Sequence, residues 1–152
     1  MAQAEATLFI VGVFKDLSWA ERGVDALTAK GFAPQGLSVL SKASPEAVAF
    51  AGKVTGAAPR EMELPAIGQT TGMGSLVQTL DGPDKDLARV GIAAAMRRAG
   101  FQPHDGLIYE TLIGRGGVLV AIEGAPRASD ALEVMLSYGG GNAAIGAWAG
   151  RV

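Results

Sequence analysis

Two stretches of the sequence share one pattern and decide the predicted fold. They are LFIVGVFKDLSWAERGVDALTAKGF, residues 8–32, and GRGGVLVAIEGAPRASDALEVMLSYGG, residues 114–140. When the two stretches are aligned so that Ala20 matches Ala128, Gly31 at the end of the first helix matches Gly139 at the end of the second. Any two strand-helix units look alike to some extent, so an internal duplication stays one of two interpretations. Under both, each stretch is predicted to be a strand followed by a helix.

The strands of the two stretches are continuous apolar runs over residues 8–14 and 117–122, which predicts burial on both faces of a sheet. Asp16 is a good N-cap for the first helix, and Gly31 suits its end. Pro126 is allowed in the first turn of the second helix. A weaker strand follows each helix, and both weaker strands are expected at sheet edges; they span residues 36–41 and 142–148.

Two such β-α-β halves predict an α/β (α+β) fold with a ferredoxin-like split β-α-β sheet. The first strands of the halves should lie side by side in the middle, with both helices on one face. The chain is interpreted as a single domain, residues 1–152, made of a first half (7–42), a helical, glycine-rich central insertion (43–115) and a second half (116–149). Because both helices cover one face, either the insertion or a second subunit must cover the other.

The central insertion has a pattern of its own. Ser44 and Pro45 indicate the start of a helix, and residues 59–65 form a candidate extended piece. Residues 66–80 are rich in glycine and threonine, and Gly68, Gly72 and Gly74 would allow close backbone approach. Two further helices are predicted, one over residues 87–100 and a short one over residues 104–114. The middle of the first, residues 90–96, is apolar nearly all round, which is typical of a helix packed on more than one side.

Composition excludes several classes of function. The chain has 152 residues, 49% hydrophobic and 18% charged, with 22 glycines. Its net charge of −2 gives no electrostatic reason to expect nucleic acid as a partner. Since there is no cysteine, disulfides and thiolate chemistry are excluded. The N-terminus does not resemble a signal peptide, and no apolar run is long enough to predict a membrane span.

Metal, cofactor and catalytic motifs are not found in the sequence. His104 is the only histidine, and the Asp81, Asp84 and Asp86 cluster lacks EF-hand spacing and is interpreted as a solvated turn. The GMGSLV stretch, residues 72–77, departs from a dinucleotide-binding motif. We therefore predict no catalytic residue, no metal and no cofactor.

Three polar residues near the second half are the candidates for a polar site. Tyr109 either anchors its helix to the sheet or contacts a ligand together with Glu110. Arg115, in the GRGG stretch, lies either in a plain helix-to-strand turn or in an anion-binding nest. An enzyme would need an acid-base site drawn from Glu110, Tyr109, Asp105 or His104.

Both ends of the chain resemble the bacterial heat-induced general-stress-protein family. The resembling segments are VGVFKDLSWAERGVDALTAKGF (residues 11–32), Tyr109-Glu110, the Gly116–Val120 strand and the Arg127–Tyr138 helix. The centre departs from that family, whose long Gly/Ala/Leu-rich stretches look membrane-associated, because Gln69, Thr70, Thr71 and Gln78 interrupt a short version here. The resemblance brings no catalytic residue to this chain.

The leading hypothesis is a non-enzymatic, cytoplasmic stress-type protein that acts by self-association or by docking to a larger protein assembly. The alternative is a small-molecule-binding regulatory domain. A peripheral position at the inner membrane, with residues 64–80 touching lipid, is left open. The residues expected at the interface are apolar ones in the insertion and near the C-terminus: Ile67, Met73, Leu76, Val77, Val90, Ile92, Met96 and Trp148.

Overall fold

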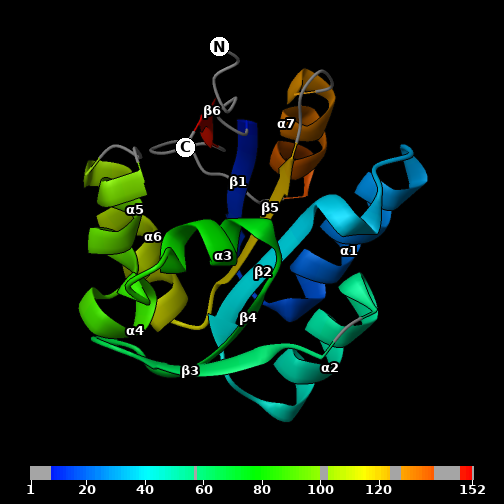
Figure 1. Cartoon of the computed structure of the whole chain (residues 1–152). Helices are drawn as coiled ribbons and strands as arrows, with labels where there is room; N and C mark the ends of the chain where they lie inside the picture. Colours follow the sequence, from blue (N-terminus) through cyan, green and yellow to red (C-terminus); the bar gives the residue numbers. More distant parts are fainter. Residues whose placement is uncertain (1–7, 57, 100–102, 124–127, 139–147, 152) are drawn as a thin grey trace.

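The computed structural model describes residues 8–56, 58–99, 103–123, 128–138 and 148–151, and in them the strands form one sheet (Figure 1). The strands are β1 (Leu8–Phe14), β2 (Leu37–Lys42), β3 (Arg60–Leu64), β4 (Gly68–Met73), β5 (Val118–Glu123) and β6 (Trp148–Arg151). The helices are α1 (Leu17–Ala29), α2 (Pro45–Thr55), α3 (Ser75–Asp81), α4 (Asp86–Val90), α5 (Ile92–Ala99), α6 (Pro103–Gly114), α7 (Ala128–Ser137) and the short 3-10 helix η1 (Pro34–Gly36).

The order of the strands is β3-β4-β2-β5-β1-β6, and every neighbouring pair is antiparallel. β1 and β5, the first strands of the two halves, lie side by side with Ile10 opposite Ile122. β2 pairs on the far side of β5, and β6 pairs on the far side of β1. The predicted α/β fold with a ferredoxin-like core is therefore confirmed.

The two central strands are buried on both faces, as their continuous apolar runs predicted. In β1, Ile10 and Phe14 point to a cluster shared with α1, α2 and α7. Phe9 and Val11, on the other face, belong to a second cluster. Alternate residues of one strand thus supply two cores, because successive side chains of a strand point in opposite directions.

The insertion covers the second face of the sheet. Helices α3, α4, α5 and α6 contribute side chains such as Leu80, Leu87, Met96 and Ile113 to the same cluster as Phe9. Figure 1 shows these helices gathered on the side of the sheet away from α1, α2 and α7. Of the two predicted ways to cover this face, the chain uses its own insertion.

The edges of the sheet differ from the prediction. The weak strand over residues 36–41 is not an edge, because the β3–β4 hairpin extends the sheet beyond β2. The strand expected over residues 142–148 is described only from Trp148, where β6 (Trp148–Arg151) begins; residues 142–147 lie outside the described part, as do Pro126 and Gly139. The piece expected to be extended over residues 59–65 is confirmed as β3.

The helix predicted over residues 87–100 is two helices. Gly91 has φ 93°, a conformation that favours glycine, and it separates α4 from α5. Residues 90–96 are apolar nearly all round, but they are not packed on all sides as expected, because Val90 and Ala94 are exposed. Ile92, Ala95 and Met96 face the core, whereas Arg97 and its neighbours on the opposite side of α5 are exposed.

The predicted helix starts are confirmed by their caps. The Oδ1 of Asp16 accepts a hydrogen bond from the Trp19 amide at 3.0 Å, and the Oγ of Ser44 accepts one from the Ala47 amide at 3.0 Å. Gly31, at the end of the first helix, has φ 92°. These local signals correctly located the starts of α1 and α2 and the end of α1.

Candidate functional site

Four of the eight apolar residues expected at an interface lie inside the protein. Leu76, Val77, Ile92 and Met96 are at most 1% exposed, because α3 and α5 turn these side chains toward the sheet. That part of the expected interface is wrong, since no partner reaches these side chains while the helices stay in place. Their burial explains why this segment is rich in apolar residues.

The remaining residues of that expected set are placed differently. Ile67 and Met73 are partly buried against the two cores. Val90 is 38% exposed at the end of α4. The backbone of Trp148 pairs with Val11, and its side chain lies outside the described part of the structure. Because Leu76, Val77, Ile92 and Met96 are buried, the expected set as a whole does not form a surface patch.

The polar candidates do not converge on one site. Tyr109 is fully buried in the cluster between α6 and the sheet, as the anchoring interpretation predicted. Glu110 turns toward α5, where its Oε2 accepts a hydrogen bond from the Ala93 amide at 3.2 Å. Arg115 lies exposed directly after the last residue of α6. Tyr109 and Glu110, two of the acid-base candidates, therefore lie in different surroundings, one in the core and the other against α5.

The aspartate cluster is structural and mostly buried. Asp81 pairs with Arg60 at 2.7 Å, and Asp86 pairs with Arg89 at 2.6 Å and with Arg98. The hydrogen bond from Arg89, with the charges of both arginines, holds the pKa of Asp86 below its ordinary value despite burial. The solvated turn expected here is wrong for Asp81 and Asp86. Among the described residues, no group of three or more His, Asp or Glu side chains could hold a metal ion.

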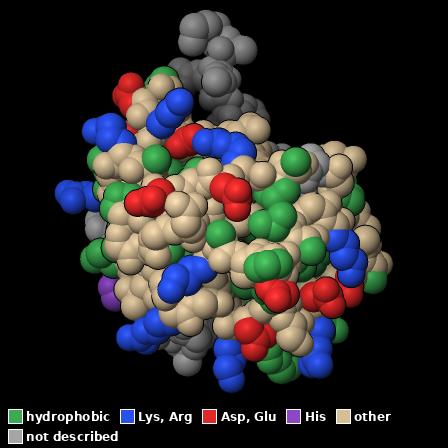
Figure 2. All heavy atoms as spheres, turned by 90° about the horizontal axis from the view of Figure 1, so that it is seen from below, with side chains coloured by type: hydrophobic (Ala, Val, Ile, Leu, Met, Phe, Trp, Pro, Cys, Tyr) green, Lys and Arg blue, Asp and Glu red, His purple; other side chains and the backbone are tan. Residues whose placement is uncertain are grey.

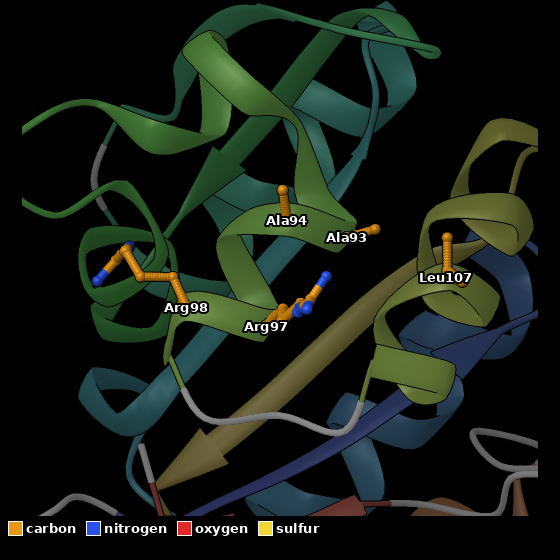
Figure 3. Close-up of a pocket in the computed structure, with 5 residues that line it drawn as sticks. All are labelled: Ala93, Ala94, Arg97, Arg98 and Leu107. Carbon is orange, nitrogen blue, oxygen red and sulfur yellow. The ribbon is translucent and has the colours of Figure 1, made fainter.

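A hollow of about 560 Å³ lies between α5 and α6. Its lining is Ala93, Ala94, Arg97, Arg98 and Leu107. Figure 3 shows Ala93 and Arg97 directed from α5 toward α6, whereas Arg98 points away from it. The hollow is thus walled by small apolar side chains, one leucine and one guanidinium that turns inward.

A second, smaller hollow of about 250 Å³ continues along the outer side of α6. Its lining is His104, Leu107, Ile108, Thr111, Leu112 and Arg115. These positions recur every three or four residues, so they share one face of the helix. We call the linings of the two hollows together the α5–α6 surface.

Leu107 is common to both hollows and is 58% exposed. It is more exposed than the other large apolar side chains that reach the described surface, among them Leu136 at 51% and Trp19 at 39%. The sequence did not reveal this residue, because α6 carries apolar side chains on its outer and its inner face. Only the packing of Tyr109 and Ile113 against the sheet decides which face is left outside.

Two arginines of the α5–α6 surface have no carboxylate within 4.0 Å in the described part of the chain. They are Arg97 and Arg115, whereas Arg98 is engaged by Asp86 and by backbone carbonyls. Elsewhere the charges are mixed: seen from the side of β3 and α2, acidic and basic side chains alternate with hydrophobic ones (Figure 2). The α5–α6 surface therefore combines exposed apolar area with two arginines, Arg97 and Arg115, that have no carboxylate partner among the described residues.

A further hollow of about 400 Å³ lies between α1 and α2. Its lining is Leu17, Ser18, Glu21, Glu46, Ala49, Phe50 and Lys53. Lys53 and Glu21 approach each other to 3.7 Å across it, and the nearby Trp19 ring carries the Arg22 guanidinium at 4.8 Å. Its charges are thus largely satisfied within the chain.

None of the described helices is both long and apolar enough to cross a lipid bilayer. No protein-family model, no curated protein and no solved structure matches the chain.

Proposed function

We propose that this chain is a non-enzymatic docking protein that associates, with a copy of itself or with a larger protein assembly, through the α5–α6 surface. The observation that carries the proposal is Leu107, which is 58% exposed and lies between two arginines without a carboxylate partner. Burying a leucine side chain stabilises by about 1.5–3 kcal/mol. An apolar centre with a polar, arginine-containing rim is typical of protein interfaces.

The location differs from the one expected from the sequence, while the class of function is the same. The apolar segment that motivated the hypothesis covers the rear of the sheet, so its side chains are occupied within the chain. The surface that remains free for contact with a partner is the outer side of two of the helices that cover the rear of the sheet. Those are α5 and α6, which are partly apolar on both sides.

The first test replaces Leu107 with Asp and uses Leu136→Asp as its matched control, because Leu136 is a leucine of similar exposure on α7. Light scattering and native mass spectrometry over a range of protein concentrations would report self-association. We expect Leu107→Asp to abolish association and Leu136→Asp to leave it unchanged. An equal response of the two variants would argue against the proposal.

The second test covers partners other than the chain itself. A photoreactive side chain at Thr111, on the α5–α6 surface, is compared with one at Ser137, which is exposed on α7. We expect specific crosslinks from position 111 that disappear in the Leu107→Asp background. Crosslinks of equal yield from both positions, or ones indifferent to Leu107, would contradict the location.

A small-molecule-binding function is the second candidate. A hollow of about 560 Å³ is within the size range of small-ligand sites, roughly 300–1,000 Å³, and Arg97 turns into it. The ligand that suits this lining is an apolar molecule with a carboxylate or another anionic group. A thermal shift with short- and medium-chain carboxylates that is lost in Arg97→Ala would favour it, and a flat response would exclude this class.

The proposal agrees with the resemblance of the chain's two ends to heat-induced general stress proteins. Under it the protein works in the cytoplasm. A peripheral position at the inner membrane would require residues 64–80 to touch lipid. Leu64, Leu76 and Val77, three of the apolar side chains in that segment, are buried in the protein, which speaks against such contact.

A further inference from the structure

We infer that the occupant of the α5–α6 surface is a second copy of this chain, with the two α6 helices packed antiparallel. The inference rests on the proposed function and names its partner. It starts from opposite charges at the two ends of α6, where Asp105 lies in the first turn and Arg115 follows the last residue. Neither side chain has an ion-pair partner in the described part of the chain.

The spacing of these charges suits a two-fold axis. The amide of Arg115 donates to the Thr111 carbonyl at 3.1 Å, so the helical path continues to this residue. With a rise of 1.5 Å per residue, Asp105 and Arg115 are about 15 Å apart along the helix. Glu110 is the midpoint between them in the sequence. A two-fold axis that passes beside Glu110 places Asp105 of each copy next to Arg115 of the other, so the ion pair forms twice.

The same axis also matches the apolar side chains. Ile108 and Leu112 are equally far from Glu110 in the sequence, so Ile108 of one copy meets Leu112 of the other. Both are partly exposed on the face that carries Leu107 and Thr111. A two-fold contact must be self-complementary, and here one position of the axis satisfies the charged and the apolar groups together.

The charges also discriminate between a second copy and an unrelated partner. An acidic segment of another protein would be attracted by Arg97 and Arg115. It would be repelled by Asp105, which stands at the opposite end of the same helix. A second copy brings Arg115 to that end, so it satisfies both charges of α6, Asp105 and Arg115. Long-range charge complementarity of this kind sets the orientation of partners more than their affinity.

The dimer is expected to be weak. Stable interfaces bury about 800 Å² on each partner, and one pair of three-turn helices with the rim of α5 provides less. We therefore expect association in the micromolar range or weaker, dependent on protein concentration and reduced by salt.

Charge reversal tests the register directly in the full chain. Asp105→Arg alone sets arginine against arginine twice in each dimer, and Arg115→Asp alone sets aspartate against aspartate twice. We expect each variant to dimerise about tenfold or more weakly than the natural chain. An equimolar mixture of the two restores both pairs, so a heterodimer should form with an affinity close to that of the natural dimer. Analytical ultracentrifugation and native mass spectrometry of the mixture measure it.

The controls keep the result unambiguous. Circular dichroism and thermal unfolding verify that each variant is folded, and Asp105→Lys with Arg115→Glu is the replacement pair if one is not. A natural chain that stays monomeric at every concentration, or a mixture that associates no better than its components, overturns the inference. If Leu107→Asp still abolishes crosslinking at Thr111 in either case, docking through this surface stands and only the second copy is excluded.

Discussion

The guanidinium of Arg98, on α5, pairs with the carboxylate of Asp86, on α4, in a position where Asp86 is only 3% exposed. The same guanidinium donates to the carbonyls of Thr79 and Leu80 at 2.9 Å each. These carbonyls belong to the last turn of α3, where backbone acceptors lack helical partners and cations are favoured. One side chain therefore connects α3, α4 and α5, three of the four helices that cover the rear of the sheet.

Replacing Arg98 with Ala should destabilise the fold by about 2 kcal/mol, because two charge-assisted hydrogen bonds to helix carbonyls are lost. Arg97→Ala is the matched control. It lies in the same turn and has no ion pair with the described residues, so its effect should stay within about 0.5 kcal/mol. Urea unfolding of both variants measures the difference. Equal losses would show that the Arg98 contacts do not stabilise this layer.

The pairing of Asp86 predicts a dependence of stability on pH. The hydrogen bond from Arg89 and the charges of Arg89 and Arg98 lower the pKa of Asp86 from its ordinary value of 3.8. Because the pKa of Asp86 is lower in the folded chain than in the unfolded chain, its ionised carboxylate stabilises the fold at pH values above the unfolded-state pKa. That contribution is lost as the pH falls through the folded value. The natural chain should therefore exceed Asp86→Asn in stability at neutral pH and lose this advantage below about pH 4.

Urea midpoints of the natural chain and of Asp86→Asn, taken from about pH 7 down to pH 3, check this dependence. Asp84→Asn, in the exposed part of the same turn, serves as the control and should follow the natural chain throughout. A stability difference between the natural chain and Asp86→Asn that stays constant across this range would contradict the assigned role of the carboxylate.

The elements that the sequence predicted well are those whose signals are local. The continuous apolar runs of β1 and β5 located the centre of the sheet, and Asp16 and Ser44 located two helix starts. For the β3–β4 hairpin the signal was partial: residues 59–65 were expected to be extended, but neither β4 nor the pairing with β2 was predicted. β3 is the charged segment REMEL and β4 is GQTTGM, and only pairing with β2 makes them part of the sheet.

The features missed depend on contacts between distant segments. Asp81 was interpreted as solvated because its partner, Arg60, comes from another element. The break at Gly91 was missed because a glycine inside an apolar helical pattern is often tolerated. The exposed face of α6 was missed for a similar reason, since Leu107 and Ile113 are both apolar and the packing of the folded chain alone separates them.

Gly23, inside α1, should resist the usual gain from replacing a helical glycine with Ala. A Cβ at this position would lie 2.5 Å from the Cζ of Phe14, a ring that is fully buried in the core. The overpacking should cost about 1–3 kcal/mol and outweigh the gain in helix propensity, which is about 1 kcal/mol. Gly114→Ala is the control, because a Cβ there meets nothing within 4 Å and should be neutral to stabilising. Thermal unfolding in which Gly23→Ala matches or exceeds Gly114→Ala would refute the clash.

Ser38 should stabilise α3 although it belongs to β2. Its Oγ accepts a hydrogen bond from the Leu76 amide at 3.0 Å in a buried position, which satisfies a donor in the first turn of α3. Ser38→Ala leaves that amide buried without an acceptor and should cost about 1–2 kcal/mol.

Ser41→Ala is the comparison for Ser38→Ala. Ser41 is buried on the same strand, yet its Oγ makes only a long bond of 3.4 Å to the carbonyl of Lys42. Its replacement should cost less, because no helix amide depends on it. Hydrogen exchange at the Leu76 amide should also accelerate in Ser38→Ala and not in Ser41→Ala. Unchanged exchange in both variants would mean that the cap from β2 does not hold the first turn of α3, and that packing of Leu76 and Leu80 alone fixes this helix on the sheet.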